Sequence, residues 1–205
     1  MSYVDDILEF WIADSEQGGE ALMRQRKRWY RSDANFDAEI RDRFEVILQA
    51  AARGEFTQWE SSPDGRLALI ILFDQFPRNI YRGRAAAFAY DHYAAHQCLE
   101  LLAAADDRQL GFVQRSFGYM PLQHSEELAL QERSVELFTL LVQTAPREWQ
   151  SFLENSRGYA VEHREIVARF GRFPHRNDIL GRNSRPEELA YLRDGGKTFG
   201  QGTGA

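Results

Sequence analysis

The stretch RLALIILFDQFPRN, residues 66–79, decides the fold of this chain. Its apolar part, LALIILF at 67–73, fits either a buried strand or a buried helix, because periodicity alone does not separate the two in a short run. Leucine and alanine outnumber the β-branched residues in it, which favours a helix. Pro77 is expected to end this helix, since the residue before a proline is pushed out of the α region.

Apolar residues recur at helical spacing through most of the remaining chain. Ser2 is expected to cap a first helix, and Gly54 lies where a helix C-cap belongs. The Pro63-Asp64-Gly65 step is typical of a turn. Further helices are expected over residues 21–30, 36–53, 84–105, 125–144 and 147–170, and a last helix follows the Ser184-Arg185-Pro186-Glu187 capping box and ends near Asp194.

The 205 residues are 43% hydrophobic and 13% aromatic, which is typical of a globular protein with a substantial core. No alternating run of β-branched or aromatic residues is long enough to predict a strand. We therefore predict an all-α fold: a single domain over residues 1–194 with about eight or nine helices. The glycine-rich tail, residues 195–205, is expected to be mobile unless something binds it.

Charge and cysteine content exclude several classes of protein. A formal net charge of -6 argues against broad nucleic-acid binding, which needs many phosphate-neutralising side chains. The single cysteine, Cys98, excludes an intramolecular disulfide and a cysteine-based zinc site, and its alanine- and leucine-rich surroundings predict a core position. The N-terminus MSYVDDILEFWIADSEQ has no signal-peptide pattern, and LALIILF is far shorter than the roughly 18–20 residues that span a bilayer. We expect a cytoplasmic protein without a membrane partner.

Positive charge gathers in RFGRFPHRNDILGR, residues 169–182, which holds four arginines and one histidine against one aspartate. The Phe-Pro step is expected to end the preceding helix and to present the next residues from a rigid turn. Arg172, Arg176 and Arg182 offer forked donors suited to a carboxylate or phosphate, and His175 adds a titratable group. Alternatively, these arginines cap helix carbonyls or pair with acidic residues elsewhere in the chain.

A second Phe-Pro corner, QFPRN at 75–79, follows Asp74 at the end of the most apolar helix. An unpaired carboxylate would be costly to bury there, so Asp74 needs a partner, and an arginine from either corner is the obvious one. The pair is either a structural strut or a functional group in which Asp74 acts as a general base or contacts a ligand. Both interpretations predict that the two corners are neighbours in space.

The other chemical patterns are weaker. His92 and His96 have metal-ligand spacing but lack an HExxH motif, and we predict no metal site there. His163 and Glu165 lack the Pro-Cys-x-x-Cys half of a zinc deaminase site. No Ser-based nucleophile elbow or phosphate-binding loop is present. Two alternatives stay open for the segment after His124: its glutamates provide acid–base groups, or Ser125 and the glutamates simply favour the start of a helix.

Three segments resemble one bacterial domain-of-unknown-function family: LALIILFDQFPRNIYRGRAAAFAYD (67–91), YMPLQHSEELALQ (119–131) and HREIVARFGRFPHRNDILGRNSRPEELAYL (163–192). The sequence ILEFW at 7–11 is similar to the start of the same family. The resemblance implies an all-helical, tetratricopeptide-like fold of antiparallel helix pairs, although the 34-residue repeat pattern itself is not visible. It implies no activity and gives no roles to the motif positions.

Two functions remain open at this point. The first is an anionic small-molecule site where the two Phe-Pro corners meet, with Asp74, His163 and His175 as acid–base candidates. The ligand-binding candidates of this site are Arg78, Asn79, His124, Glu126, Arg172, Arg176, Asn177 and Arg182. The second is a non-enzymatic module that binds a peptide or partner protein in a groove lined by Trp11, Trp29, Trp59 and Trp149. The sequence indicates neither a cofactor nor a reaction type.

Overall fold

The structure, a computed structural model, describes residues 2–31 and 33–200, and these residues form helices and turns but no strand. The α-helices are α1 (Tyr3–Trp11), α2 (Gly19–Trp29), α3 (Ala34–Ala52), α4 (Pro63–Ile70), α5 (Phe76–Ile80), α6 (Asp91–Ala103), α7 (Phe112–His124), α8 (Leu128–Thr144), α9 (Arg147–Phe170) and α10 (Pro186–Arg193). A π-helical segment, Ile71–Gln75, joins α4 to α5 without a break, so the described residues form nine helices. The predicted all-α class and helix number are confirmed.

The expected caps are present at the first and third helices. Ser2 Oγ accepts from the Asp5 backbone N–H at 3.2 Å, and the Asp5 carboxylate accepts from the Ser2 backbone N–H at 3.0 Å. Gly54 follows α3 with φ +80°, in the left-handed region that glycine occupies without a Cβ penalty. A side-chain cap therefore fixes where α1 begins, and a glycine in the left-handed region fixes where α3 ends.

Two proline-based predictions were wrong. The Pro63-Asp64-Gly65 step is the first turn of α4, where Ser62 Oγ accepts from the Gly65 N–H at 3.1 Å. Pro77 does not end the apolar helix but lies in the first turn of α5. Pro63 lies at the start of a helix, where its fixed φ suits the helix and its missing N–H removes no essential hydrogen bond. Pro77 lies inside a continuous helix, directly after the π-helical segment.

Helix α7 was not predicted, because Gly118 and Pro121 are poor helix formers inside it. Burial overrides that propensity, since Val113, Phe117 and Leu122 are almost completely buried. The predicted helix over 84–105 was wrong in its first part, where Ala85–Phe88 form a separate 3-10 turn before α6. The helix predicted from Ser125 begins at Leu128 instead.

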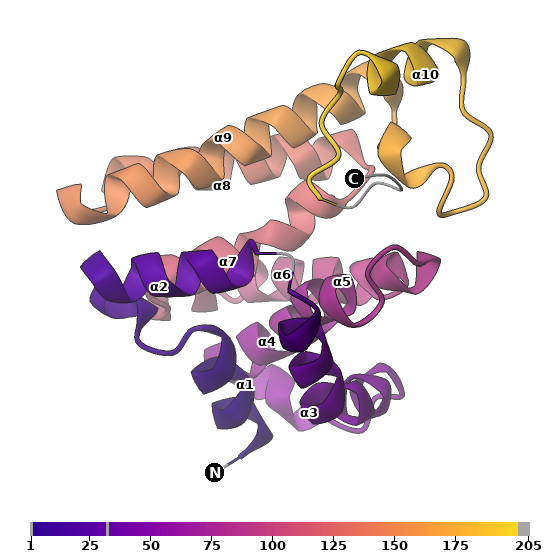
Figure 1. The fold of residues 1–205 in the computed structure, drawn as a ribbon. Coiled ribbons are helices and arrows are strands. Elements are labelled where there is room, and N and C mark those ends of the chain that lie inside the picture. The colour runs from indigo at the N-terminus through magenta and orange to yellow at the C-terminus, as the bar shows by residue number, and fades with distance from the viewer. Residues whose placement is uncertain (1, 32, 201–205) are drawn as a thin grey trace.

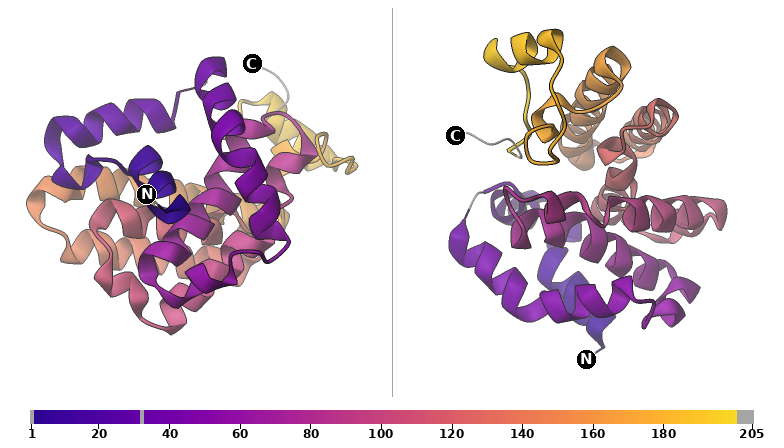
Figure 2. Two further views of the ribbon diagram at one scale, coloured as in Figure 1. Left: turned by 90° about the horizontal axis from the view of Figure 1, so that it is seen from below. Right: turned by 90° about the vertical axis from the view of Figure 1, so that its right-hand side faces the viewer.

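Figure 1 shows α8, α9 and α10 at one end of the molecule and α1, α3 and α4 at the other, with α2 and α7 between them. The same order of layers is visible in the right-hand view of Figure 2. Helices α8 and α9 pack along their length as an antiparallel pair, joined by the short Ala145-Pro146 connection. After α10 the chain returns to the region between the α8–α9 pair and the helices on the other side of it (Figures 1 and 2).

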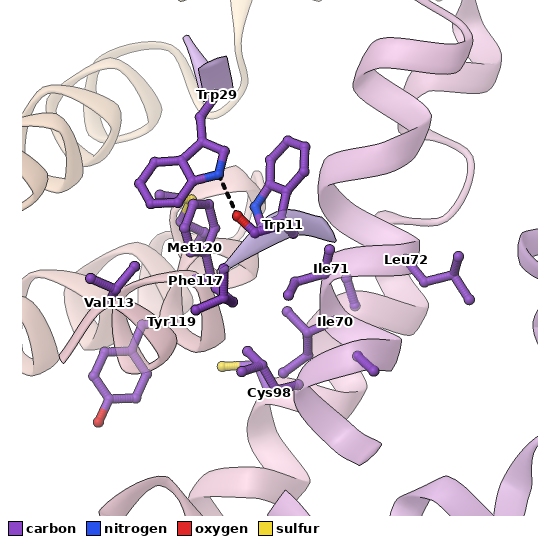
Figure 3. Packing of buried hydrophobic residues seen from close by; sticks show 14 of the residues in the cluster. Trp11, Trp29, Ile70, Ile71, Leu72, Cys98, Val113, Phe117, Tyr119 and Met120 are labelled. Carbon is purple, nitrogen blue, oxygen red and sulfur yellow. Dashed lines mark hydrogen bonds between the residues drawn. The ribbon is translucent and has the colours of Figure 1, made fainter. Parts of the chain in front are cut away.

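The core explains why residues 67–73 are apolar on every side. Leu67, Ile70 and Ile71 are fully buried, so this helix is surrounded by other helices rather than facing water. Figure 3 shows Trp11 beside it and Trp29 next to Trp11, with the Trp29 indole N–H donating to the Trp11 carbonyl oxygen at 2.8 Å. Cys98 is also fully buried in this cluster, as predicted.

Within the described part of the chain, no helix combines the length and apolar character that crossing a membrane requires.

Candidate functional site

Asp74 is the buried centre of the first Phe-Pro corner. The π-helical segment places its carboxylate fully inside the protein. Arg78 lies 3.1 Å from Asp74 Oδ1, and the Gln75 side-chain amide also donates to this carboxylate. Burial alone would raise the pKa of Asp74, but Arg78 and His124 outweigh it and lower the pKa to about 2. Asp74 is therefore a carboxylate at any physiological pH.

His124, at the end of α7, is held by that carboxylate. Its Nδ1 lies 2.7 Å from Asp74 Oδ1, and because the carboxylate can only accept, the Nδ1–H donates. Burial lowers the pKa of His124 below its ordinary value even though Asp74 opposes the shift. The imidazole is thus neutral near pH 7, and Nε2 is its remaining acceptor nitrogen.

The two Phe-Pro corners are neighbours, as both interpretations of the sequence predict. Asp91, the first residue of α6, lies 2.9 Å from Arg78 NH1 and 3.5 Å from Arg176 NH1. Arg176 also donates to the His124 carbonyl oxygen at 3.0 Å. A single aspartate and the end of α7 therefore join a corner near residue 78 to one near residue 176.

A cavity of about 470 Å³ opens beside these groups. Its cationic lining residues are Arg31, Arg78, Arg82, Arg176 and Lys197, and none of the described residues that line it is acidic. Each cation pairs with an acid that lies outside the lining, for example Arg82 with Asp37 at 2.8 Å. The cations of these pairs therefore line the cavity, whereas their acidic partners do not.

Two further histidines line the cavity and are almost completely buried. His163 donates its Nδ1–H to the Tyr159 carbonyl oxygen at 2.7 Å, and burial together with His124 lowers the pKa of His163 well below its ordinary value. Burial and the neighbouring Arg176 lower the pKa of His175 to about 3. Both imidazoles are therefore neutral near pH 7.

The C-terminal segment forms another wall of the cavity. The Phe199 ring stacks on His163 with the ring centroids 3.7 Å apart, and Gly200 also lines the cavity. Lys197 Nζ lies 3.2 Å from a Glu162 carboxylate oxygen. These contacts concern residues 197–200 only, and residues 201–205 lie outside the described residues. The mobility of the tail stays a prediction.

A model of the bacterial protein family of unknown function DUF924 matches residues 7–196. The chain belongs to this family. This chain is also similar to a protein of unknown function from Agrobacterium tumefaciens whose structure has been solved. The two sequences are 37% identical, and the two structures superimpose with a TM-score of 0.79. The similarity covers 94% of this chain and 97% of that chain. No curated protein matches. These comparisons support the helical fold and give no activity.

Five of the candidate residues of this DUF924 protein lie outside the cavity lining: Asp74, and four residues that form hydrogen bonds around the turn after α9. Arg172 donates two hydrogen bonds, 2.7 and 2.8 Å long, to the buried carboxylate of Glu188, and the Asn177 amide donates to the same carboxylate at 3.2 Å. Arg182 forms a comparable fork, 2.6 and 2.9 Å, with Glu126. The geometry therefore gives these four residues a structural setting: they hold the turn after α9 and the start of α10.

The remaining candidates divide clearly. Those that line the cavity are Arg78, Asn79, His124, His163, His175 and Arg176. Asp74 lies directly behind the lining, where it contacts Arg78 and His124. Sequence reasoning missed Asp91, Tyr159 and Phe199. No local pattern marks those two rings, because only the packing of α9 against the C-terminal segment brings them to the cavity.

A second hollow of about 560 Å³ shares His124 and Arg176 with the cavity. It differs in charge, because Asp91, Glu126 and Glu127 line it together with His92, His96 and several apolar side chains. Among the described residues, no cluster of histidine, cysteine or carboxylate side chains has the arrangement of a metal site. The second hollow is therefore less suited to an anion than the cavity is.

Proposed function

We propose that this DUF924 protein binds an anionic small molecule in the cavity between the two Phe-Pro corners. The observation that carries the proposal is the charge of the lining: five cationic side chains and no carboxylate among the described lining residues, in a protein of net charge -6. A concave site with one sign of charge and low-dielectric walls concentrates ligands of the opposite charge. Its volume also falls within the usual range for small-molecule sites.

Arg176 and His175 form the most specific part of this proposal. Among the described residues, Arg176 Nε and His175 Nδ1 are buried polar atoms without a hydrogen-bond partner. Burial lowers the pKa of Arg176 to about 10, although Asp91 opposes the shift. A bound carboxylate or phosphate would supply negative charge and a hydrogen-bond acceptor for the Arg176 Nε–H, and it would also accept from His175 in the tautomer that is protonated at Nδ1.

The acid–base role is best assigned to His124. Asp74 is fully buried, outside the lining and fixed as a carboxylate, so it positions the imidazole rather than reacting itself. The Nε2 atom of His124 is then the proton acceptor for a ligand bound in the cavity. His163 has the same arrangement, with Nδ1 bound to a carbonyl oxygen, and His175 remains the third candidate. Catalysis itself stays a prediction.

The strut hypothesis and the ligand hypothesis are compatible. The Asp74–Arg78 pair ties the first corner together, and Asp91 ties that corner to Arg176. Such pairs fix the positions of the arginines before any ligand arrives, which reduces the ordering cost of binding. Arg172 and Arg182 are better explained as struts alone, because their forks are filled by Glu188 and Glu126.

The peptide-groove hypothesis loses its main support. Trp11, Trp29 and Trp149 are buried in the core and cannot form a continuous exposed surface for a peptide. A partner protein, the tetratricopeptide-like character of the helix pairs and the cytoplasmic location stay predictions.

Thermal unfolding with a panel of anions tests the proposal. Phosphate, sulfate, acetate and citrate are added to the wild type, to Arg176→Gln, to Lys197→Gln and to the control Arg133→Gln. Arg133 is an exposed arginine that pairs with Glu136 on α8, outside the cavity lining. A ligand present at about 100 times its dissociation constant adds about 2.7 kcal/mol of stability.

At least one anion should stabilise the wild type and Arg133→Gln equally. The same anion should stabilise Arg176→Gln and Lys197→Gln less. The proposal is wrong if no anion stabilises the wild type, or if both cavity variants respond as the wild type does.

A further inference from the structure

The buried and the solvent-facing parts of the cavity both carry cations, with Arg31 and Lys197 on the exposed side, but they differ in their tyrosines. Its buried end is cationic, since Arg78 and Arg176 are only 7% and 6% exposed. Its solvent-facing part carries two tyrosines, Tyr30 and Tyr159, which are 56% and 41% exposed. A ligand that reaches the arginines with its anionic group must therefore place the rest of its body beside aromatic rings.

These rings come from three separate parts of the chain. Tyr30 follows α2, Tyr159 lies on α9, and Phe199 belongs to the C-terminal segment. The Tyr159 and Phe199 rings pack edge to face, with centroids 6.4 Å apart. Tyr30 and Tyr159 are exposed and Phe199 is half-buried. Aromatic side chains that converge on one concave site are typical of ligand recognition, because they offer large apolar faces at low entropic cost.

The position of Phe199 strengthens the argument. Its φ is +52°, in the left-handed region that bulky residues seldom adopt, so the local backbone is strained. Contacts made by Lys197 hold the strained segment: its backbone N–H donates to the Tyr191 hydroxyl at 2.9 Å, and its side chain pairs with Glu162. The chain thus maintains an unfavourable backbone conformation that keeps an aromatic ring at the cavity.

We infer that the ligand of the cavity is an organic anion whose carboxylate or phosphate is attached to a flat ring, and that this ring packs against Phe199 and Tyr159. The inference rests on the proposed anion site and adds the class of ligand. Aromatic pairs gain free energy beyond the area they bury, whereas a saturated ring of the same size gains only from burial. The site therefore discriminates flat from puckered rings.

Three phosphates separate the contributions: inorganic phosphate, cyclohexyl phosphate and phenyl phosphate, titrated calorimetrically into the full-length protein. The two esters have similar size and charge and differ in whether the ring is flat. The wild type should bind phenyl phosphate about two- to tenfold more tightly than cyclohexyl phosphate, the range expected for an aromatic pair. Benzoate and cyclohexanecarboxylate repeat the comparison for carboxylates and show which oxyanion the site prefers.

In Phe199→Leu the dissociation constant of cyclohexyl phosphate divided by that of phenyl phosphate should fall toward one. The substitution keeps an apolar side chain and removes the aromatic face. Tyr159→Leu should act in the same direction, so the test does not depend on one variant. The control Tyr3→Leu changes an exposed aromatic residue outside the cavity lining and should keep the wild-type ratio.

The outcomes distinguish this inference from the proposed function. Equal binding of both esters by the wild type would overturn the flat-ring inference and leave the anion site standing. Tighter binding of phenyl phosphate by Phe199→Leu would also overturn it, since Phe199 would then be an obstruction rather than a wall. If no phosphate or carboxylate binds at all, the anion site and the flat-ring inference both fail.

Discussion

His124 Nδ1 and Asp74 Oδ1 lie 2.7 Å apart, and this contact joins the end of α7 to the π-helical segment that follows α4. Because the buried carboxylate accepts the Nδ1 proton, it fixes the tautomer of the imidazole and leaves Nε2 as the acceptor. The carbonyl oxygen of the same histidine accepts from Arg176. The orientation of His124 therefore depends on both Phe-Pro corners.

Asp74→Asn should lower the free energy of unfolding by about 3 kcal/mol, because it removes the charge from a buried pair and leaves Arg78 less compensated. Urea denaturation at pH 7 measures the change. Asp194→Asn is the matched control: this aspartate is exposed and 3.9 Å from Arg193, so its substitution should change stability by less than about 0.5 kcal/mol. Equal effects of the two variants would show that Asp74 is not a central buried partner.

Stability should fall when the pH decreases from 7 to 5, because His163 and His175 are buried in their neutral form. Their pKa values are lowered in the folded protein, to about 3 for His175, whereas unfolded histidines titrate near 6.5. The unfolded state therefore binds more protons between these pKa values. The stabilisation is complete above about pH 6.5 and is lost progressively toward about pH 3.

Urea unfolding at pH 7, 6 and 5 measures this slope for the wild type, His175→Asn and His92→Asn. The His175 variant should have a shallower slope, because it removes one of the groups responsible. His92 is exposed, so His92→Asn should keep the wild-type slope. A wild-type stability that does not change between pH 7 and pH 5 would contradict the neutral, buried state of these histidines.

Arg172 and Arg176 should respond differently to the same substitution, although both lie in the basic corner. Arg172→Gln is expected to lower the melting temperature without abolishing stabilisation by an anion, because Arg172 holds Glu188 outside the cavity. Arg176→Gln is expected to remove that stabilisation. Thermal unfolding with and without the anion found in the panel compares the two. If the anion no longer stabilised Arg172→Gln against thermal unfolding, Arg172 would be a ligand contact rather than a structural residue.

Much of the fold was predictable because a helix that is buried on all sides has apolar residues at every position. LALIILF is apolar on all sides, and the structure surrounds that helix with others. The Ser2 cap was visible because its partner, Asp5, is three residues away. Helix α7 was not visible, since Gly118 and Pro121 weaken the local signal and only tertiary burial stabilises the helix.

The part of the site that depends on contacts within one helical turn was predictable. Asp74 and Arg78 are one helical turn apart, so their pairing follows from local geometry. Asp91 links Arg78 to Arg176 through long-range contacts, which the spacing of residues along the sequence does not predict. Arg172 and Arg176 share one motif, yet one fills a fork with Glu188 and the other lines the cavity. Sequence alone does not say which way an arginine on a tight turn points.

The five histidines allow the most direct test of the central claim, that an anion binds in the cavity. His163 and His175 line the cavity, His92 and His96 line the second hollow, and His124 is shared by both. Imidazole ¹H–¹⁵N spectra, assigned with single His→Gln variants, are recorded while phosphate is added at constant pH and ionic strength.

The account predicts that the signals of His124, His163 and His175 shift together along one saturable curve, while those of His92 and His96 stay unchanged. Saturable shifts confined to His92, His96 and His124 would place the anion in the second hollow instead. The absence of any saturable shift, for phosphate and for phenyl phosphate alike, would contradict the anion-binding account.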